Sequence, residues 1–82
     1  MLTVEQLRAA RGLVGWSQTA LAENSGVALS TVRRMETGQS RVRGHSENVW
    51  KVQTALENAG VQFIDENDSG GVGVRLRDRE IR

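Results

Sequence analysis

Residues 16–38, with the sequence WSQTALAENSGVALSTVRRMETG, predict two short helices joined by a tight turn. Ser17 is a favourable N-cap for the first helix, and Leu21 and Ala22 give that helix a small apolar face. Gly26 then ends the helix, because glycine readily adopts the left-handed backbone of a C-terminal cap. The stretch therefore indicates a helix, a glycine turn and a second helix.

The second helix has an apolar face and a polar, basic face. Val32 and Met35 are three residues apart and are expected to point inward. The outward face is expected to carry four side chains: Leu29, Ser30, Arg33 and Arg34. A basic face on a short, rigid helix fits the major groove of DNA.

This pattern resembles the helix-turn-helix repressors of the Cro/lambda-repressor (Xre) type. The matching residues are Gln18, Leu21, Ala22, Gly26, Val27, Val32, Met35, Glu36 and Gly38. The resemblance covers roughly residues 3–60 and implies a mainly α, lambda-repressor-like bundle. The expected helices are 3–13, 17–25, 28–37 and 46–59. Beyond them the chain looks more like small bacterial members that end in a β-hairpin.

The length of 82 residues fits one small domain, whose marginal core often needs help from oligomerisation. There is no cysteine and only one histidine, His45, so neither a metal site nor a cofactor is expected. No apolar run approaches the roughly 20 residues of a membrane span, and the N-terminus does not resemble a signal peptide. We therefore expect a cytoplasmic bacterial protein. His45 has only local polar neighbours in its loop, so an enzyme is not expected.

Charge is distributed unevenly along the chain. The formal net charge is only +1, but residues 28–45 contain four arginines and one glutamate and thus net +3. The stretch 65–68 is acidic. Charge gathered on one segment indicates nucleic-acid binding better than the total does.

Thr3 and Gln6 have the spacing of a capping box at the start of the first helix. Arg11 falls within the apolar stripe of that helix, so its guanidinium must be paired or must reach solvent. The family resemblance implies a structural ion pair between Arg11 and Glu36. The alternative is that Arg11 lies at the edge of the stripe and is solvated.

Several side chains are expected to contact DNA phosphates. By resemblance, Gln18 bonds a phosphate near the N-terminus of its helix, where free N–H groups assist. Thr31 points sideways toward the backbone, and Arg41 and Arg43 in the loop 39–45 would neutralise flanking phosphates. The alternative for Gln18 and for the loop is simple solvation.

Base reading is expected from the second helix of the motif. Arg34 is the strongest candidate, bidentate to guanine, and Arg33 either does the same or reaches a phosphate. Ser30 could bond almost any base, whereas Leu29 offers only an apolar contact, for example to a thymine methyl. Either arginine could instead be a solvated surface residue.

The C-terminal part, residues 61–82, predicts an antiparallel hairpin with strands 61–65 and 72–77, and a frayed end at 78–82. Ser46 is expected to cap the preceding helix and Gly60 to end it. An isolated hairpin is barely stable, so it should pack on helix 46–59 or pair across a dimer axis. Trp50 lies partly off the core stripe and invites a contact surface.

These features lead to a functional hypothesis. Residues 1–60 form a helix-turn-helix DNA-binding domain, and the chain acts as a transcriptional regulator, most simply a repressor. It would bind a palindromic operator as a homodimer through residues 61–77 and Trp50, with recognition helices about 34 Å apart. The alternative is a protein-binding antitoxin or anti-activator that retains the fold and docks through Trp50 and the hairpin.

Overall fold

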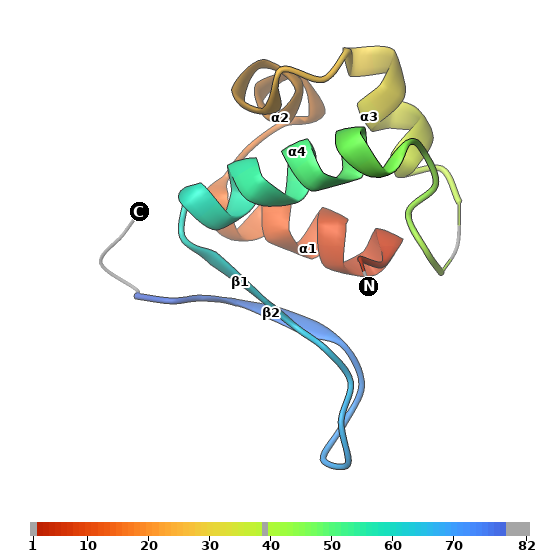
Figure 1. The fold of residues 1–82 in the computed structure, drawn as a ribbon. Helices are drawn as coiled ribbons and strands as arrows, with labels where there is room; N and C mark the ends of the chain where they lie inside the picture. Colours follow the sequence, from red (N-terminus) through yellow and green to blue (C-terminus); the bar gives the residue numbers. More distant parts are fainter. Residues whose placement is uncertain (1, 39, 79–82) are drawn as a thin grey trace.

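The computed structural model describes residues 2–38 and 40–78, which fold into helices followed by a hairpin (Figure 1). The elements are α1 (Val4–Val14), α2 (Gln18–Ser25), α3 (Leu29–Met35), α4 (Ser46–Asn58), β1 (Val61–Ile64) and β2 (Gly73–Leu76). The predicted mainly α bundle with a C-terminal antiparallel hairpin is confirmed. Most of the predicted frayed end, residues 79–82, lies outside the described residues.

The expected capping box at the start of α1 is present. The Thr3 hydroxyl accepts a hydrogen bond from the Gln6 amide at 3.1 Å, and Gln6 Oε1 accepts one from the Thr3 amide at 2.9 Å. Two N–H groups that helix geometry leaves without partners are thus satisfied. The box fixes the first turn of α1, and this turn also contacts two parts of the chain that are distant in sequence.

The helix-turn-helix unit follows the predicted local signals. The Ser17 hydroxyl accepts from the Ala20 amide at 3.0 Å, and Gly26 ends α2 with φ +73°. α3 is shorter than predicted, because the chain tightens after Met35. The amide of Glu36 bonds the Arg33 carbonyl three residues back, and the Thr37 hydroxyl bonds the Arg34 carbonyl.

The helix α4 begins at the predicted residue 46 and ends one residue before the predicted residue 59, and each cap lies one residue before the predicted cap. His45, not Ser46, is the N-cap, because its carbonyl already accepts the amide of Val49 at 3.0 Å. At the other end Ala59 keeps a right-handed backbone and is the C-cap, and Gly60 follows with φ +110°. The first helical N–H groups of α4 therefore have no side-chain cap from His45.

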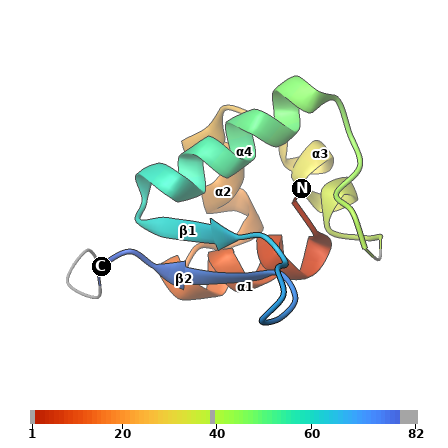
Figure 2. The same ribbon diagram turned by 60° about the horizontal axis from the view of Figure 1, so that its bottom comes forward.

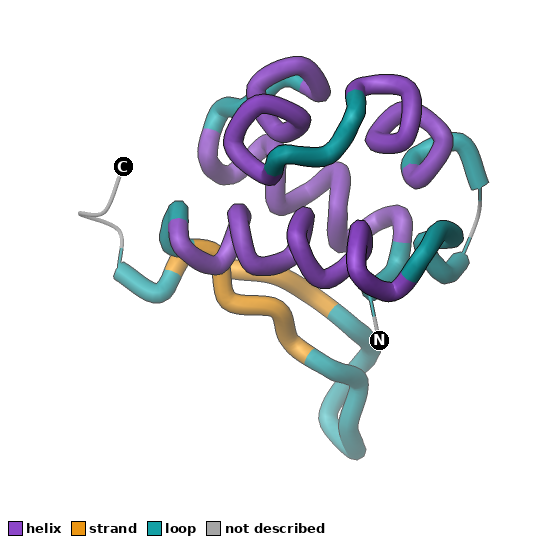
Figure 3. The backbone as a smooth tube through the Cα atoms, turned by 45° about the horizontal axis from the view of Figure 1, so that its top comes forward, coloured by secondary structure: helices purple, strands orange, loops and turns teal. Residues whose placement is uncertain are grey.

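Side chains from all four helices and from β1 form one core. Figure 3 shows α4 running along one side of the other helices, with the hairpin beneath it. The core residues are Leu7, Ala10, Leu21, Ala22, Val27, Val32, Met35, Val52, Ala55, Leu56 and Val61. Trp16 packs against this cluster. No helix in the described ranges is long and apolar enough to cross a membrane.

The hairpin packs on α1 as well as on α4, whereas only α4 was expected (Figure 2). Val61 pairs with Leu76 and Phe63 with Val74, and all four side chains contact the core. The reason for the contact with α1 is Gln6, whose side-chain nitrogen donates to the carbonyls of Ile64 at 3.1 Å and Gly73 at 3.0 Å. One buried amide thus holds both strands.

Candidate nucleic-acid interface

α3 buries one face and presents the other to solvent. Val32 and Met35 are buried, whereas Ser30, Arg33 and Arg34 are exposed. The hairpin lies on the side of the molecule away from α2 and α3, so it does not cover them (Figure 1). The exposed residues of α3 are therefore accessible to a large ligand such as a DNA duplex.

Leu29 does not lie fully on the outward face of α3, where it was expected. Its side chain is half-buried and packs against the core. The physical reason is its spacing, because Leu29 and Val32 are three residues apart and share a face of the helix. Only part of the Leu29 side chain is left to touch a base.

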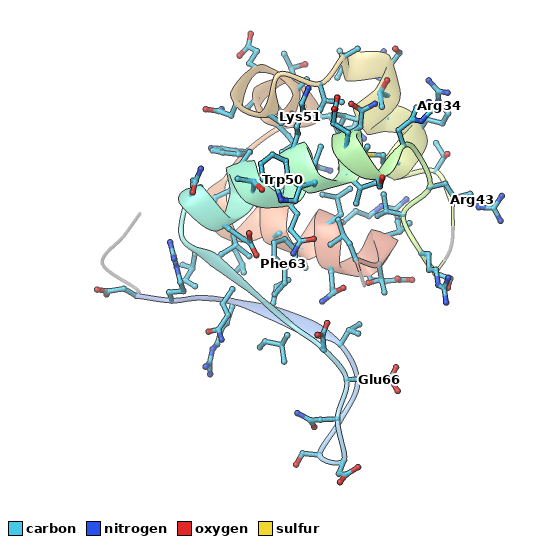
Figure 4. All side chains as sticks on the ribbon, in the orientation of Figure 1. Arg34, Arg43, Trp50, Lys51, Phe63 and Glu66 are labelled. Carbon is cyan, nitrogen blue, oxygen red and sulfur yellow. The ribbon has the colours of Figure 1, made fainter. Side chains whose placement is uncertain are left out.

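Arg34 and Arg43 lie on the same side of the molecule, although they come from α3 and from the loop before α4 (Figure 4). Each lines two adjoining surface depressions. The first, about 420 Å³, is lined by Thr31, Arg34, Arg43, Gly44, His45 and Asn48. The second, about 370 Å³, is lined by Arg34, Met35, Thr37, Gly38, Arg41 and Arg43. The structure therefore brings Arg34 together with both loop arginines and with Thr31.

The chemistry of these depressions suits anions. Guanidinium groups bind phosphate oxygens with paired, charge-assisted hydrogen bonds. The arginines of the segment 28–45 are all exposed, whereas its single acid, Glu36, is only 3 % exposed. The solvent-exposed surface of this segment is therefore more basic than its formal net charge of +3 indicates.

Glu36 is held by Arg11, in the geometry that the family resemblance implied. Arg11 Nε lies 2.7 Å from Glu36 Oε2, and Arg11 Nη2 donates to Oε1 at 2.8 Å. The third nitrogen, Nη1, donates to the Trp16 carbonyl at 2.9 Å. The hydrogen bonds that Arg11 donates to Glu36 raise the pKa of Arg11, and the opposite charge of Glu36 adds to this, while burial acts against it.

Gln18 does not face open solvent. It is half-buried, and its side-chain nitrogen donates to Glu36 Oε1 at 3.2 Å. The residue expected to bond a phosphate thus also contacts the carboxylate at the end of α3. α1, α2 and α3 are joined by this one side chain of Glu36.

Arg8 is a residue that the sequence interpretation missed. Its Nη2 donates to the backbone carbonyl of Glu36, and its Nε lies 4.0 Å from Glu36 Oε1. The signal was available, because Arg8 and Arg11 are three residues apart and must lie on one face of α1. Arg8 therefore binds the C-cap residue of α3 from the outer side of the pair.

The geometry is one of exposed arginines around a short helix whose far end is fixed by a buried ion pair. Within the described ranges, no group of three or more His, Cys, Asp or Glu residues could hold a metal ion. No curated protein matches the chain significantly. The family model for the helix-turn-helix matches residues 7–45, from α1 through the loop that carries Arg41 and Arg43. Over these residues the chain is similar to helix-turn-helix proteins of the Xre/Cro type, a family of DNA-binding regulators.

Proposed function

We propose that this protein is a cytoplasmic bacterial transcriptional repressor that binds a palindromic operator as a homodimer. One observation carries the proposal: the exposed face of α3 stands beside the exposed arginines of the following loop, and the hairpin leaves both uncovered. A short helix with flanking cations matches the shape and the charge of a major groove and its phosphates.

In this proposal the contacts divide into two kinds. Arg34 reads guanine from the exposed face of α3, with Ser30 and Arg33 beside it. Thr31, Gln18, Arg41 and Arg43 bond phosphates and set the register of the helix. Leu29, being half-buried, contributes at most an edge contact to a thymine methyl.

The test is binding to oligonucleotides selected from a random pool, measured over a series of salt concentrations. Arg41→Gln and Arg43→Gln should each lower the slope of log affinity against log salt by about one. Arg34→Gln should instead relax the choice of base at one position, by about 1–3 kcal/mol of discrimination.

Arg75 supplies the matched control, since it is an exposed arginine on the outer face of the hairpin, bonded to Gln62. Arg75→Gln removes the same charge but keeps the main-chain groups of the hairpin edge through which the dimer is proposed, so slope and base preference should remain as in the wild type. If Arg34→Gln and the loop variants bind DNA as the wild type does, the assignment of this face is wrong.

The dimer is supported by two surfaces. β1 and β2 pair only with each other among the described strands, so the hairpin keeps free edges. Trp50 is 66 % exposed, which is unusual for the largest apolar side chain. Hydroxyl-radical footprinting should show two protected half-sites about one helical turn apart, and sedimentation should show dissociation on dilution. A protein that is monomeric at all concentrations and protects one site would overturn the dimer.

The surroundings of Trp50 favour a second candidate function, a protein-binding antitoxin or anti-activator. A depression of about 180 Å³ lies beside the ring, lined by Asn24, Ser25, Trp50, Lys51, Thr54, Ala55 and Asn58. An exposed tryptophan next to a hollow is typical of binding hot spots. The test is co-purification with the product of a neighbouring gene: Trp50→Ser should abolish it and Arg34→Gln should not.

A further inference from the structure

The residues before α1 pair with the basic loop that follows α3. Thr3 and Arg41 form an isolated antiparallel bridge. The Val4 amide donates to the Ser40 carbonyl at 2.7 Å, and the Val42 amide donates to the Leu2 carbonyl at 3.1 Å. Backbone bonds therefore hold the loop on both sides of Arg41.

The anchor is itself firmly placed. Leu2 is 6 % exposed and Val4 is 1 % exposed, so the paired segment is fixed by its own apolar side chains. Thr3 is held by the capping box with Gln6. Gln6 in turn bonds both strands of the hairpin. The first turn of α1 thus contacts the loop on one side and the hairpin on the other.

The described residues of the loop, 40–45, are mostly exposed. Ser40 has a left-handed backbone, φ +75°, which a residue with a Cβ rarely adopts without support. Arg41, Arg43 and Gly44 are exposed, and Val42 is half-buried against the core. A phosphate contact from a loose loop would lose affinity, because binding would have to order the chain.

We propose that residues 2–4 are positioning residues for DNA binding. They hold Arg41 beside α3, and through Val42 they also hold Arg43 there. The loop arginines can then reach phosphates while α3 reads the bases. The segment acts through the loop and raises affinity without choosing sequence. This inference rests on the proposed function.

Val4→Pro is the sharpest test. Val4 is the first residue of α1, where proline is favoured because that N–H has no partner within the helix. Thr3 is already extended (φ −101°, ψ 160°), as the residue before proline must be. The substitution therefore deletes the bond to Ser40 while the helix can persist. Val4→Ala is the matched control: it trims the buried side chain but keeps the N–H.

Binding is measured with the full chain and the selected oligonucleotide over a salt series. Val4→Pro should weaken binding several-fold and lower the salt slope by one to two, the share of the two loop arginines. Its base preference should equal that of the wild type, and Val4→Ala should keep the wild-type slope. Adding Arg41→Gln to Val4→Pro should cost less affinity than adding it to the wild type, because the arginine has already lost its position.

A readout that needs no variant is amide hydrogen exchange in the free protein. The amides of Val4 and Val42 should exchange slowly, as bonded amides do. Fast exchange at both would overturn the inference, as would wild-type affinity and slope in Val4→Pro. Those results would leave DNA binding by α3 intact, whereas a wild-type protein that binds no duplex at any salt would remove the proposed function and this inference together.

Discussion

The buried carboxylate of Glu36 allows a quantitative prediction about what holds α3 in place. The change is Glu36→Gln, which keeps the size of the side chain and removes its charge. In the wild type the carboxylate accepts two bonds from Arg11, at 2.7 and 2.8 Å, and one from Gln18 at 3.2 Å. The amide retains one acceptor oxygen, and its NH₂ group would face a guanidinium that can only donate.

The magnitude follows from the burial of the two partners. Breaking a buried ion pair from one side costs about 3–5 kcal/mol. The Arg11 side chain is 20 % exposed and can be partly hydrated, so we expect the lower end, about 3 kcal/mol. A domain of this length has roughly 4–12 kcal/mol of total stability. The melting temperature should then fall by roughly 12–24 °C.

Urea unfolding followed by circular dichroism measures this change. A loss of 3 kcal/mol should shift the midpoint by roughly 1–3 M. Replacing both partners, Arg11→Met with Glu36→Met, should recover more than half of the loss, because neither charge is then left buried alone. The recovered protein should still bind DNA more weakly, since Gln18 loses its partner at the end of α3.

The effect should not depend on pH through Arg11. A raised pKa means that its stabilisation is fully present below the pKa of the unfolded chain and is lost only as the pH rises through the folded pKa. A cost of Glu36→Gln below about 1 kcal/mol would refute the reasoning, because exposed pairs contribute at most that much. So would a double variant that is less stable than Glu36→Gln alone.

Three further changes test other parts of the fold and the surface. Gly26→Val forces a branched side chain into the left-handed turn (φ +73°) and should cost about 2 kcal/mol or more in thermal unfolding, while Gly70→Val at the exposed hairpin tip serves as the control. Ala28→Ser should add the missing cap of α3 and stabilise by about 1 kcal/mol, and an unchanged urea midpoint would count against it. Gln6→Glu places a carboxylate against the carbonyls of Ile64 and Gly73 and should detach the hairpin. The NMR signals of β1 and β2 should then shift while those of α2 and α3 stay unchanged, and an undisturbed hairpin spectrum would contradict the role of Gln6.

Local signals in the sequence predicted the helices well, because each has a short-range physical cause. The capping box of Thr3 with Gln6, the cap at Ser17 and the left-handed turn at Gly26 depend only on nearby residues. The caps of α4 were each predicted one residue too late, since which carbonyl accepts the first helical bond depends on how the loop enters the helix. Leu29 was expected to point outward but is half-buried against the core, as its three-residue spacing from Val32 allows.

Long-range backbone contacts could not have been predicted from the residues alone. The pairing of Thr3 with Arg41 uses main-chain groups, which every residue possesses, and therefore leaves no pattern in the sequence. The bonds from Gln6 to the two strands of the hairpin could not be predicted either, because the capping box already accounts for a glutamine at this position. The arginine cluster was predicted in part: charge counting found the segment, but only the fold shows that Arg34, Arg41 and Arg43 line one depression.

The modest net charge of +1 is no argument against DNA as the ligand, because the side of α3 is locally basic. Glu36 is buried against Arg11, so this side presents arginines to solvent without that acid among them. Among the exposed acids of the hairpin loop, Asp65 and Glu66 line a depression together with Arg41, whereas Glu66 stands far from Arg34 in Figure 4. A duplex would therefore be attracted most strongly around Arg34, which favours the approach that brings α3 to the groove. Salt shortens the Debye length and so screens the electric field that orients the duplex. The association rate of the proposed complex should therefore drop steeply with salt, even though the protein is nearly neutral overall.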